Sequence, residues 1–197
     1  MISVYNIKPK FQQLLKPILE LFYKAGITAN MITWAAVILS IATGVLIWWH
    51  PFGISFIILP LMLLIRMALN ALDGMMAKNY NMQSKSGELL NEFGDVFSDF
   101  IMFFPLFKLF SLNTFILIAF LFLSLMNEFA GILGKVISGV RRYEGPMGKS
   151  DRAFVIGLLS LVFYCNNQLI CYADYIFLIC ISLLLLSTTI RIIKTLK

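Results

Sequence analysis

Long apolar stretches separated by short polar segments run through most of the chain. A helix needs about 20 largely apolar residues to cross the hydrocarbon core of a bilayer. Six stretches of roughly this length are present, covering approximately residues 31–49, 54–77, 87–107, 115–136, 153–171 and 175–193. The pattern therefore predicts an all-α membrane protein with six transmembrane helices.

Residues 1–30 show a different pattern, in which apolar and basic positions alternate along a helix. The apolar residues recur at near-helical spacing: Leu14, Leu15, Ile18, Leu19, Leu21 and Phe22. Three lysines interrupt them: Lys10, Lys16 and Lys24. This arrangement is typical of an amphipathic helix lying in the membrane surface, which Pro17 would start or kink. We therefore divide the chain into an interfacial helix (1–30) and a six-helix transmembrane domain (31–197).

Composition supports a membrane location. Hydrophobic residues make up 60% of the 197 residues and charged residues only 13%, whereas soluble domains are about half apolar and a quarter charged. The formal net charge is +6, but no soluble basic domain exists to carry nucleic-acid binding. We therefore expect the protein to lie in the lipid bilayer and not to bind nucleic acid.

Basic residues are concentrated in alternate connecting segments. Of the 16 Lys and Arg residues, 14 lie in the N-terminal segment, the second-to-third loop, the fourth-to-fifth loop and the C-terminal tail. Segments rich in Lys and Arg stay on the cytoplasmic side of a membrane. The expected location is the cytoplasmic (inner) membrane, with both termini in the cytoplasm.

Half of the ten acidic residues fall in one short stretch, from Asn70 to Asp99. Spacings of three and four residues place side chains on one helical face. Two such faces occur: Asn70, Asp73 and Ala77 in the second predicted helix, and Gly87, Asn91, Asp95 and Asp99 in the third. Their oxygens would converge near the cytoplasmic surface, as hard divalent cations require. The alternative is ordinary helix packing by small and polar residues, which does not explain so many carboxylates.

This stretch resembles the signature of the CDP-alcohol phosphatidyltransferase family, D-x2-D-G-x2-A-R, eight residues, then G-x3-D-x3-D. The matching residues are Asp73, Gly74, Ala77, Gly87 and Asp95. Two further segments are similar to family motifs: Thr28–Thr33 at the entry to the first helix, and Gly148-Lys149 after the fourth. The resemblance spans most of the chain, and six helices is the family's architecture.

The resemblance implies an enzyme that moves a phosphatidyl group from CDP-diacylglycerol to a small alcohol and releases CMP. It implies two divalent ions, Mg²⁺ or Mn²⁺, held by Asn70, Asp73, Asn91 and Asp95. Asp95 would also be the general base. The CDP group would lie against Asp73, Gly74, Ala77, Lys78 and Gly87. A homodimer is common in this family.

Three signature positions depart from the family's pattern. Asn70 and Asn91 replace aspartates, and Lys78 replaces an arginine. Asparagine offers an oxygen ligand without charge, so metal binding could be weaker and depend on the substrate diphosphate. Other carboxylates could supply the missing charge: Glu88, Glu92 or Asp99. A third interpretation is a catalytically degenerate member that acts as a non-enzymatic membrane protein.

The predicted fourth-to-fifth loop, residues 137–152, carries a cluster of cations: Arg141, Arg142, Lys149 and Arg152. Arginine and lysine are common phosphate ligands, so we expect a phosphorylated acceptor such as glycerol 3-phosphate. Two alternatives remain open: a loop that only contacts anionic lipid heads, and an unphosphorylated acceptor alcohol. Glu128 and Lys135, seven residues apart on the preceding helix, are expected to make polar contacts inside the bundle.

Overall fold

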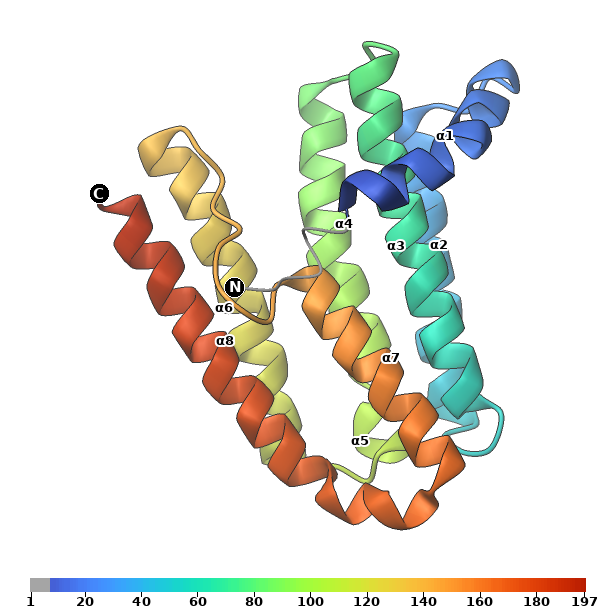
Figure 1. Ribbon diagram of the computed structural model, residues 1–197, viewed down its shortest axis with the longest axis vertical. Coiled ribbons are helices and arrows are strands. Elements are labelled where there is room, and N and C mark those ends of the chain that lie inside the picture. Colours follow the sequence, from blue (N-terminus) through green and yellow to red (C-terminus); the bar gives the residue numbers. More distant parts are fainter. Residues whose placement is uncertain (1–7) are drawn as a thin grey trace.

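The computed structural model describes residues 8–197, and within this range the only regular elements are helices (Figure 1). They are α1 (Lys8–Lys24), α2 (Ala29–Trp49), α3 (Ser55–Asn79), α4 (Lys85–Phe103), α5 (Leu106–Leu109), α6 (Thr114–Ser138), α7 (Lys149–Cys165), the 3-10 helix η2 (Asn167–Tyr172) and α8 (Ala173–Thr195). The all-α prediction is confirmed, and each predicted apolar stretch contains one long helix.

Four segments of the described chain are long and apolar enough to cross a membrane: α2, α3, α6 and the run Asn167–Thr195 that includes α8. The protein is therefore a membrane protein with several apolar helices. Helix α7 has 17 residues, and α4 carries several acidic side chains. That these two also span the bilayer, to give six spans in all, stays a prediction.

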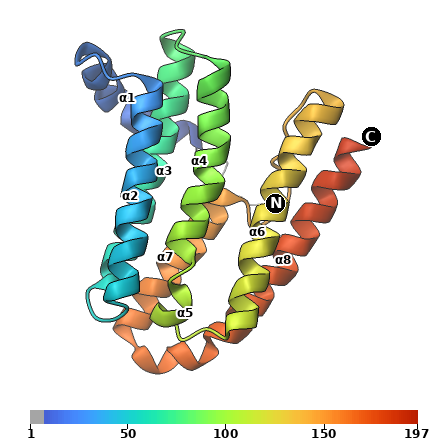
Figure 2. The ribbon, with the colours of Figure 1, turned by 180° about the vertical axis from the view of Figure 1, so that it is seen from behind.

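The long helices form two groups joined across the bundle. Helix α2 packs against α3 and α4, α3 packs against α7, and α6 pairs with α8 along most of its length (Figures 1 and 2). The α3–α4 turn and the C-terminal ends of α6 and α8 lie at the same end of the molecule as α1, which crosses that end at an angle (Figure 1). Of the segments predicted to be cytoplasmic, α1, the α3–α4 turn and the C-terminal end of α8 therefore share one end, whereas the connection from α6 to α7 runs from that end to the middle of the bundle (Figure 1).

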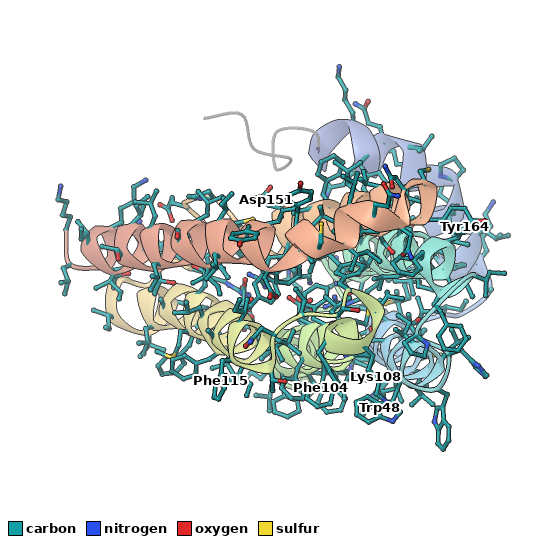
Figure 3. All side chains as sticks on the ribbon, turned by 90° about the horizontal axis from the view of Figure 1, so that it is seen from below. Trp48, Phe104, Lys108, Phe115, Asp151 and Tyr164 are labelled. Atoms are coloured by element: carbon teal, nitrogen blue, oxygen red, sulfur yellow. The ribbon has the colours of Figure 1, made fainter. Side chains whose placement is uncertain are left out.

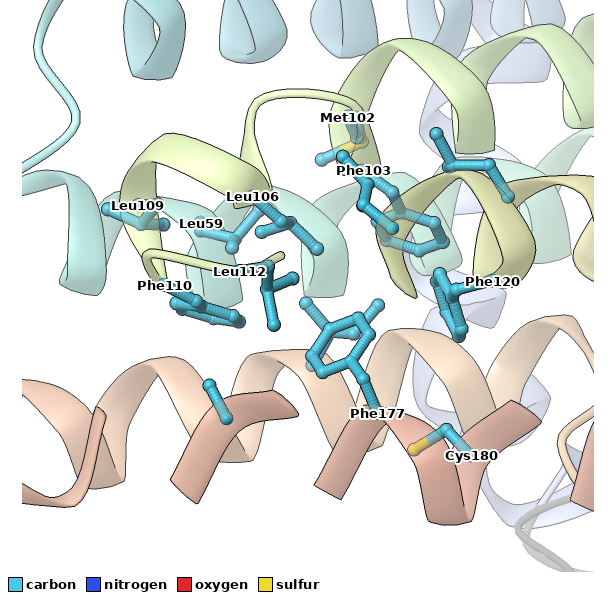
Figure 4. Close-up of a cluster of buried hydrophobic side chains, with 14 of the residues drawn as sticks. Leu59, Met102, Phe103, Leu106, Leu109, Phe110, Leu112, Phe120, Phe177 and Cys180 are labelled. Carbon is cyan, nitrogen blue, oxygen red and sulfur yellow. The ribbon is translucent and has the colours of Figure 1, made fainter. Parts of the chain in front are cut away.

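An aromatic core holds the opposite end together. Phe120 and Phe177 meet edge to face with ring centroids 4.9 Å apart, and Phe110 contacts Phe163 in the same way at 5.1 Å. Figure 4 shows Phe110, Phe120 and Phe177 among leucine side chains of α3 and α5. Other aromatic side chains point outward, including Trp48, Phe104 and Phe115 (Figure 3). Outward apolar side chains are expected where lipid surrounds a bundle.

Helix α1 is anchored to the bundle by its apolar side. Leu15 and Leu19 are buried in a cluster with residues of α2 and α3. Tyr23 stacks on Tyr80 at a centroid distance of 3.7 Å. Pro17 lies inside α1, so the prediction that it starts the helix is wrong. Placement of α1 in the membrane surface stays a prediction.

Two of the predicted helices have ends that are wrong by several residues. The third stretch was expected to continue to residue 107, but α4 ends at Phe103, two residues before Pro105. Proline ends helices because it lacks an N–H and its ring clashes with the preceding turn. The fifth was expected over 153–171, whereas α7 covers Lys149–Cys165. Lys149 and Arg152, expected in a loop, therefore lie in the first turn of α7.

Candidate active site

A cavity of about 560 Å³ opens between α2, α3 and α4 near the α3–α4 turn. Its walls combine small residues with polar ones: Ala29, Asn30, Thr33, Asp73, Gly74, Ala77, Met82, Gln83, Ser84, Lys85, Gly87, Glu88 and Asn91. Ser84 begins α4 as its N-cap, because its hydroxyl accepts the Gly87 N–H at 3.0 Å. Four of the five residues expected to lie against the CDP group therefore line a cavity: Asp73, Gly74, Ala77 and Gly87.

Asp73 is the buried carboxylate in the wall of this cavity, with 4% of its surface exposed. Its Oδ2 accepts a hydrogen bond from the Thr33 hydroxyl at 2.9 Å. The two glycines differ in what they permit. A Cβ at Gly74 would meet no atom within 4 Å, whereas one at Gly87 would lie 2.7 Å from Asn30 Oδ1. Gly74 therefore opens onto space, and Gly87 allows α4 to approach α2.

Asp95 lies on α4 one helical turn beyond Asn91, away from the α3–α4 turn, and is surrounded by donors. Its Oδ1 accepts a hydrogen bond from Asn70 Nδ2 at 3.0 Å, and its Oδ2 forms an ion pair with Lys149. Arg66 donates to the Asp95 carbonyl oxygen at 3.0 Å and lies 3.9 Å from its carboxylate. Three helices thus fix this carboxylate: α3, α4 and α7.

A buried ion-pair network lies below Asp95. Arg152 is fully buried, and its guanidinium contacts Asp99 at 2.7 Å and Glu128 at 3.1 Å, while donating to the Met147 carbonyl. Asp99 also pairs with Arg66. Buried charges are stable only when they are paired and hydrogen-bonded. Arg152 is therefore placed to join α4, α6 and α7, and it is not exposed to a soluble ligand.

The other cations of this cluster also face carboxylates. Arg141 pairs with Glu92 and, at 3.1 Å, with Glu128, and Arg142 lies 3.8 Å from Glu144. Burial raises the pKa of the Glu144 carboxyl, but hydrogen bonds from backbone N–H groups and Lys194 outweigh it, and the pKa lies below its usual value. The cluster thus consists of matched opposite charges.

Arg191 is a site-forming residue that the sequence did not single out. It is 2% exposed, donates to the carbonyl oxygens of Asn127 and Glu144 at 2.6 and 3.1 Å, and lies 3.9 Å from Glu128. It was counted only as a cation of the C-terminal tail. The sequence did contain a signal for this role, because Arg191 lies within an apolar helix. Charged residues in such helices usually have a functional or structural partner.

The three carboxylates considered as substitute metal ligands are each paired with a cation. Glu88 contacts the exposed Lys135, Glu92 contacts Arg141, and Asp99 lies in the buried network. Among residues 8–197, no group of three or more His, Cys, Asp or Glu side chains could hold a metal ion. Glu128 and Lys135 were both expected to make polar contacts inside the bundle. Glu128 is buried and does so, whereas Lys135 is exposed, so the expectation is wrong for Lys135.

Residues 26–192 match the family described as CDP-alcohol phosphatidyltransferase. The chain belongs to this family. Inner membrane protein YnbA of Escherichia coli (strain K12) is 45% identical over 189 residues, which cover 96% of this chain and 94% of YnbA.

The fold is also similar to a solved structure. The crystal structure of Mycobacterium tuberculosis phosphatidylinositol phosphate synthase (PgsA1) with CDP-DAG bound matches with a TM-score of 0.77 and 14% sequence identity. The match covers 93% of this chain and 94% of that one. At this identity the likeness shows a common fold. The family match places the chain in the enzyme class of CDP-alcohol phosphatidyltransferases.

The phosphatidyltransferase signature maps onto the cavity with one exception. Asp73, Gly74, Ala77 and Gly87 line it, but Lys78 is exposed and is not among the lining residues. Lys85, at the start of α4, contributes to the wall instead. The basic side chain facing the cavity therefore comes from the other helix of the pair.

Family members generally use divalent metal ions, and the donor set can be tested for such an ion. The four signature positions offer only oxygen ligands of the hard type that Mg²⁺ and Mn²⁺ prefer: carboxylates from Asp73 and Asp95, and amide carbonyls from Asn70 and Asn91. Mg²⁺ is commonly bound by one or two carboxylates together with substrate phosphates and water. The set fits this mode of binding, in which the substrate completes the coordination.

Proposed function

We propose that this enzyme transfers a phosphatidyl group from CDP-diacylglycerol to a hydroxyl of a small alcohol. The observation that carries the proposal is the placement of Asp73 in the wall of a cavity of about 560 Å³, while Asp95 of α4 accepts a hydrogen bond from Asn70, which lies one helical turn from Asp73. The alcohol oxygen forms a new bond to the phosphorus that bears diacylglycerol. The bond from that phosphorus to CMP breaks, and the alcohol proton leaves to a base.

The cavity between α2, α3 and α4 is proposed to take the CDP head group. Gly74 leaves open space at its wall, and Lys85 supplies a positive charge facing the cavity. Lysine binds phosphate as a point charge. The lipid tails would stay in the bilayer beside the apolar outer faces of these helices, while the head group reaches the polar end.

A divalent ion, Mg²⁺ or Mn²⁺, would be held by Asp73 with oxygens of Asn70, Asn91 and Asp95. When bound, such an ion neutralises charge on the diphosphate and polarises the reacting phosphoryl group. The resemblance to the family implied two such ions.

Asp95 is proposed as the general base. A base must lie within hydrogen-bond reach of the proton that it removes. Arg66 and Asn70 hold Asp95 in place from α3, and Lys149 does so from α7. These contacts fix the carboxylate, so the acceptor hydroxyl is the partner that moves into position.

The acceptor proposed here is a small uncharged polyol, which was an alternative at the sequence level. A phosphorylated acceptor was expected because Arg141, Arg142, Lys149 and Arg152 were thought to be available for phosphate. Each of the four lies within 4.0 Å of a carboxylate oxygen. A phosphate would have to displace a carboxylate from its cation, so the exchange would add little affinity.

Release of labelled CMP from CDP-diacylglycerol tests the function directly. Purified protein with Mg²⁺ or Mn²⁺ is screened against free polyols and their phosphate esters, and kcat/KM is compared within each pair. We expect metal-dependent CMP release and a higher kcat/KM for the free polyol. A preference for the phosphate ester would return the acceptor to the sequence-based expectation, and no CMP release with any alcohol would contradict the enzymatic function.

A non-enzymatic role on the same scaffold is the competing proposal, motivated by Asn70 and Asn91. In that case neither the unaltered protein nor the Asp95→Asn variant would release CMP from CDP-diacylglycerol with any alcohol. Metal-dependent CMP release that Asp95→Asn abolishes excludes the non-enzymatic role.

A further inference from the structure

The charge at the donor set is small for two divalent ions. Four signature positions face one another on α3 and α4, but only Asp73 and Asp95 carry carboxylates. Asn70 turns its amide N–H toward Asp95 at 3.0 Å and so acts there as a donor. The two carboxylates are also unlike in their surroundings, because Asp73 lines the cavity and Asp95 does not.

Lys149 brings a positive charge to Asp95. The connection from α6 to α7 folds back along α6 and α8, so α7 begins midway along the bundle (Figure 1). The Arg142 N–H donates to the Gly131 carbonyl, and Arg191 and Ser187 donate to the Glu144 carbonyl, which holds the connection there. Lys149 is thereby delivered to Asp95 Oδ2.

We propose that the site binds a single divalent cation beside Asp73, and that the Lys149 ammonium is the built-in second positive charge at Asp95. This inference rests on the proposed function for its substrate. An ammonium group is a compact point charge without directional coordination requirements, so it can neutralise Asp95 without further ligands. Asn70 and Asn91 leave too little negative charge for a second metal ion. A second dication at Asp95 would have to displace Lys149 and would be repelled by Arg66, 3.9 Å away.

Binding stoichiometry tests this inference without relying on turnover. Free Mn²⁺ is measured by electron paramagnetic resonance during titration of the detergent-purified full chain in the presence of CDP. We expect one tightly bound Mn²⁺ per chain for the unaltered protein. The Lys149→Gln/Asn91→Asp variant, which frees Asp95 and restores a carboxylate, is expected to bind two. Lys194→Gln is the matched control, since it removes an exposed lysine ion-paired with Glu144, and it should bind one.

Two Mn²⁺ ions, or none, bound to the unaltered chain would overturn the inference. So would a single ion on Lys149→Gln/Asn91→Asp, provided that the variant elutes and melts like the parent. If that variant fails to fold, Lys149→Met/Asn91→Asp takes its place in the same titration, again with two bound ions expected and a single ion overturning the inference. CMP release measured on the same samples keeps the two proposals apart. CMP release together with two bound ions refutes only the inference, whereas one bound ion without CMP release refutes only the proposed function.

Discussion

The two signature carboxylates occupy different environments, and both are expected to be essential. Asp95→Asn removes the proposed base, and loss of a general base typically lowers turnover by about 10²–10⁴-fold. Asp73→Asn removes the carboxylate in the cavity wall and should lower it by a comparable factor. Initial rates of CMP release measure both. Asp174→Asn at the opposite end is the control, because an amide oxygen can still accept the Asn113 N–H. Near-normal rates for Asp95→Asn would remove the base assignment.

Arg152 and Arg142 belong to one sequence cluster but should differ strongly in their effect on stability. Arg152 is fully buried between Asp99 and Glu128, whereas Arg142 is 21% exposed and 3.8 Å from Glu144. Removing one partner of a buried ion pair costs about 3–5 kcal/mol, and partly exposed pairs contribute about 0–1 kcal/mol. Thermal unfolding in detergent should therefore show a large loss of Tm for Arg152→Met and a small one for Arg142→Met. Equal losses would contradict the described network.

At the scale of secondary structure, the sequence predicted the helices better than their ends. An apolar stretch of the required length identifies a membrane helix, because a single segment in lipid can satisfy its backbone N–H and C=O groups only by forming a helix. The start of α7 was missed because Lys149, Ser150 and Asp151 look like a loop. In the structure Asp151 accepts the Gly148 N–H at 3.2 Å, and this contact begins the helix within the polar interior.

The pairing of charges could not be predicted from the sequence either, because it depends on where α7 begins. The four carboxylates of 88–99 and the cations of 141–152 are about 50 residues apart, and their register depends on how deeply the α6–α7 connection descends. Residue types at signature spacing were sufficient to predict the wall of the cavity, which Asp73, Gly74, Ala77 and Gly87 all line. They were not sufficient for Arg66 or Arg191, whose roles depend on partners in distant helices.

The α6–α7 connection should be sensitive to substitution where it touches α8. Gly145 has a φ of +97°, and an added Cβ would lie 2.5 Å from the Ser187 hydroxyl. Gly139 also has a positive φ, +75°, but a Cβ there would meet nothing within 4 Å. Both alanine variants suffer backbone strain of about 1–3 kcal/mol, and only Gly145→Ala adds the clash. We expect Gly145→Ala to reduce CMP release and to expose the connection to limited proteolysis, with Gly139→Ala less affected. Equal behaviour of the two variants would show that contact with α8 does not position Lys149.

The whole molecule is polarised: the α3–α4 turn beside the cavity and the C-terminal end of α8 lie at one end, the aromatic core lies towards the other, and the network around Arg152 lies between them, where α7 begins (Figure 1). Such an arrangement suits a lipid substrate whose head group meets a water-soluble acceptor while its tails remain in the bilayer. The exposed apolar faces of the helices, such as those bearing Trp34, Phe93 and Phe122, are available to lipid or to a second copy of the chain. Homodimer formation stays a prediction.

Orientation in the membrane gives the last prediction. Because 14 of the 16 basic residues lie in segments of the polar end, the positive-inside rule places that end in the cytoplasm. The native Cys171, exposed in η2 at the opposite end, should react with an impermeant thiol reagent added outside. In a chain lacking native cysteines, Val140→Cys and Lys197→Cys should react only after the membrane is permeabilised. Labelling of Val140→Cys in intact cells would place the charge network on the wrong side for a cytoplasmic CDP-lipid. That result would overturn the orientation and the site assignment together.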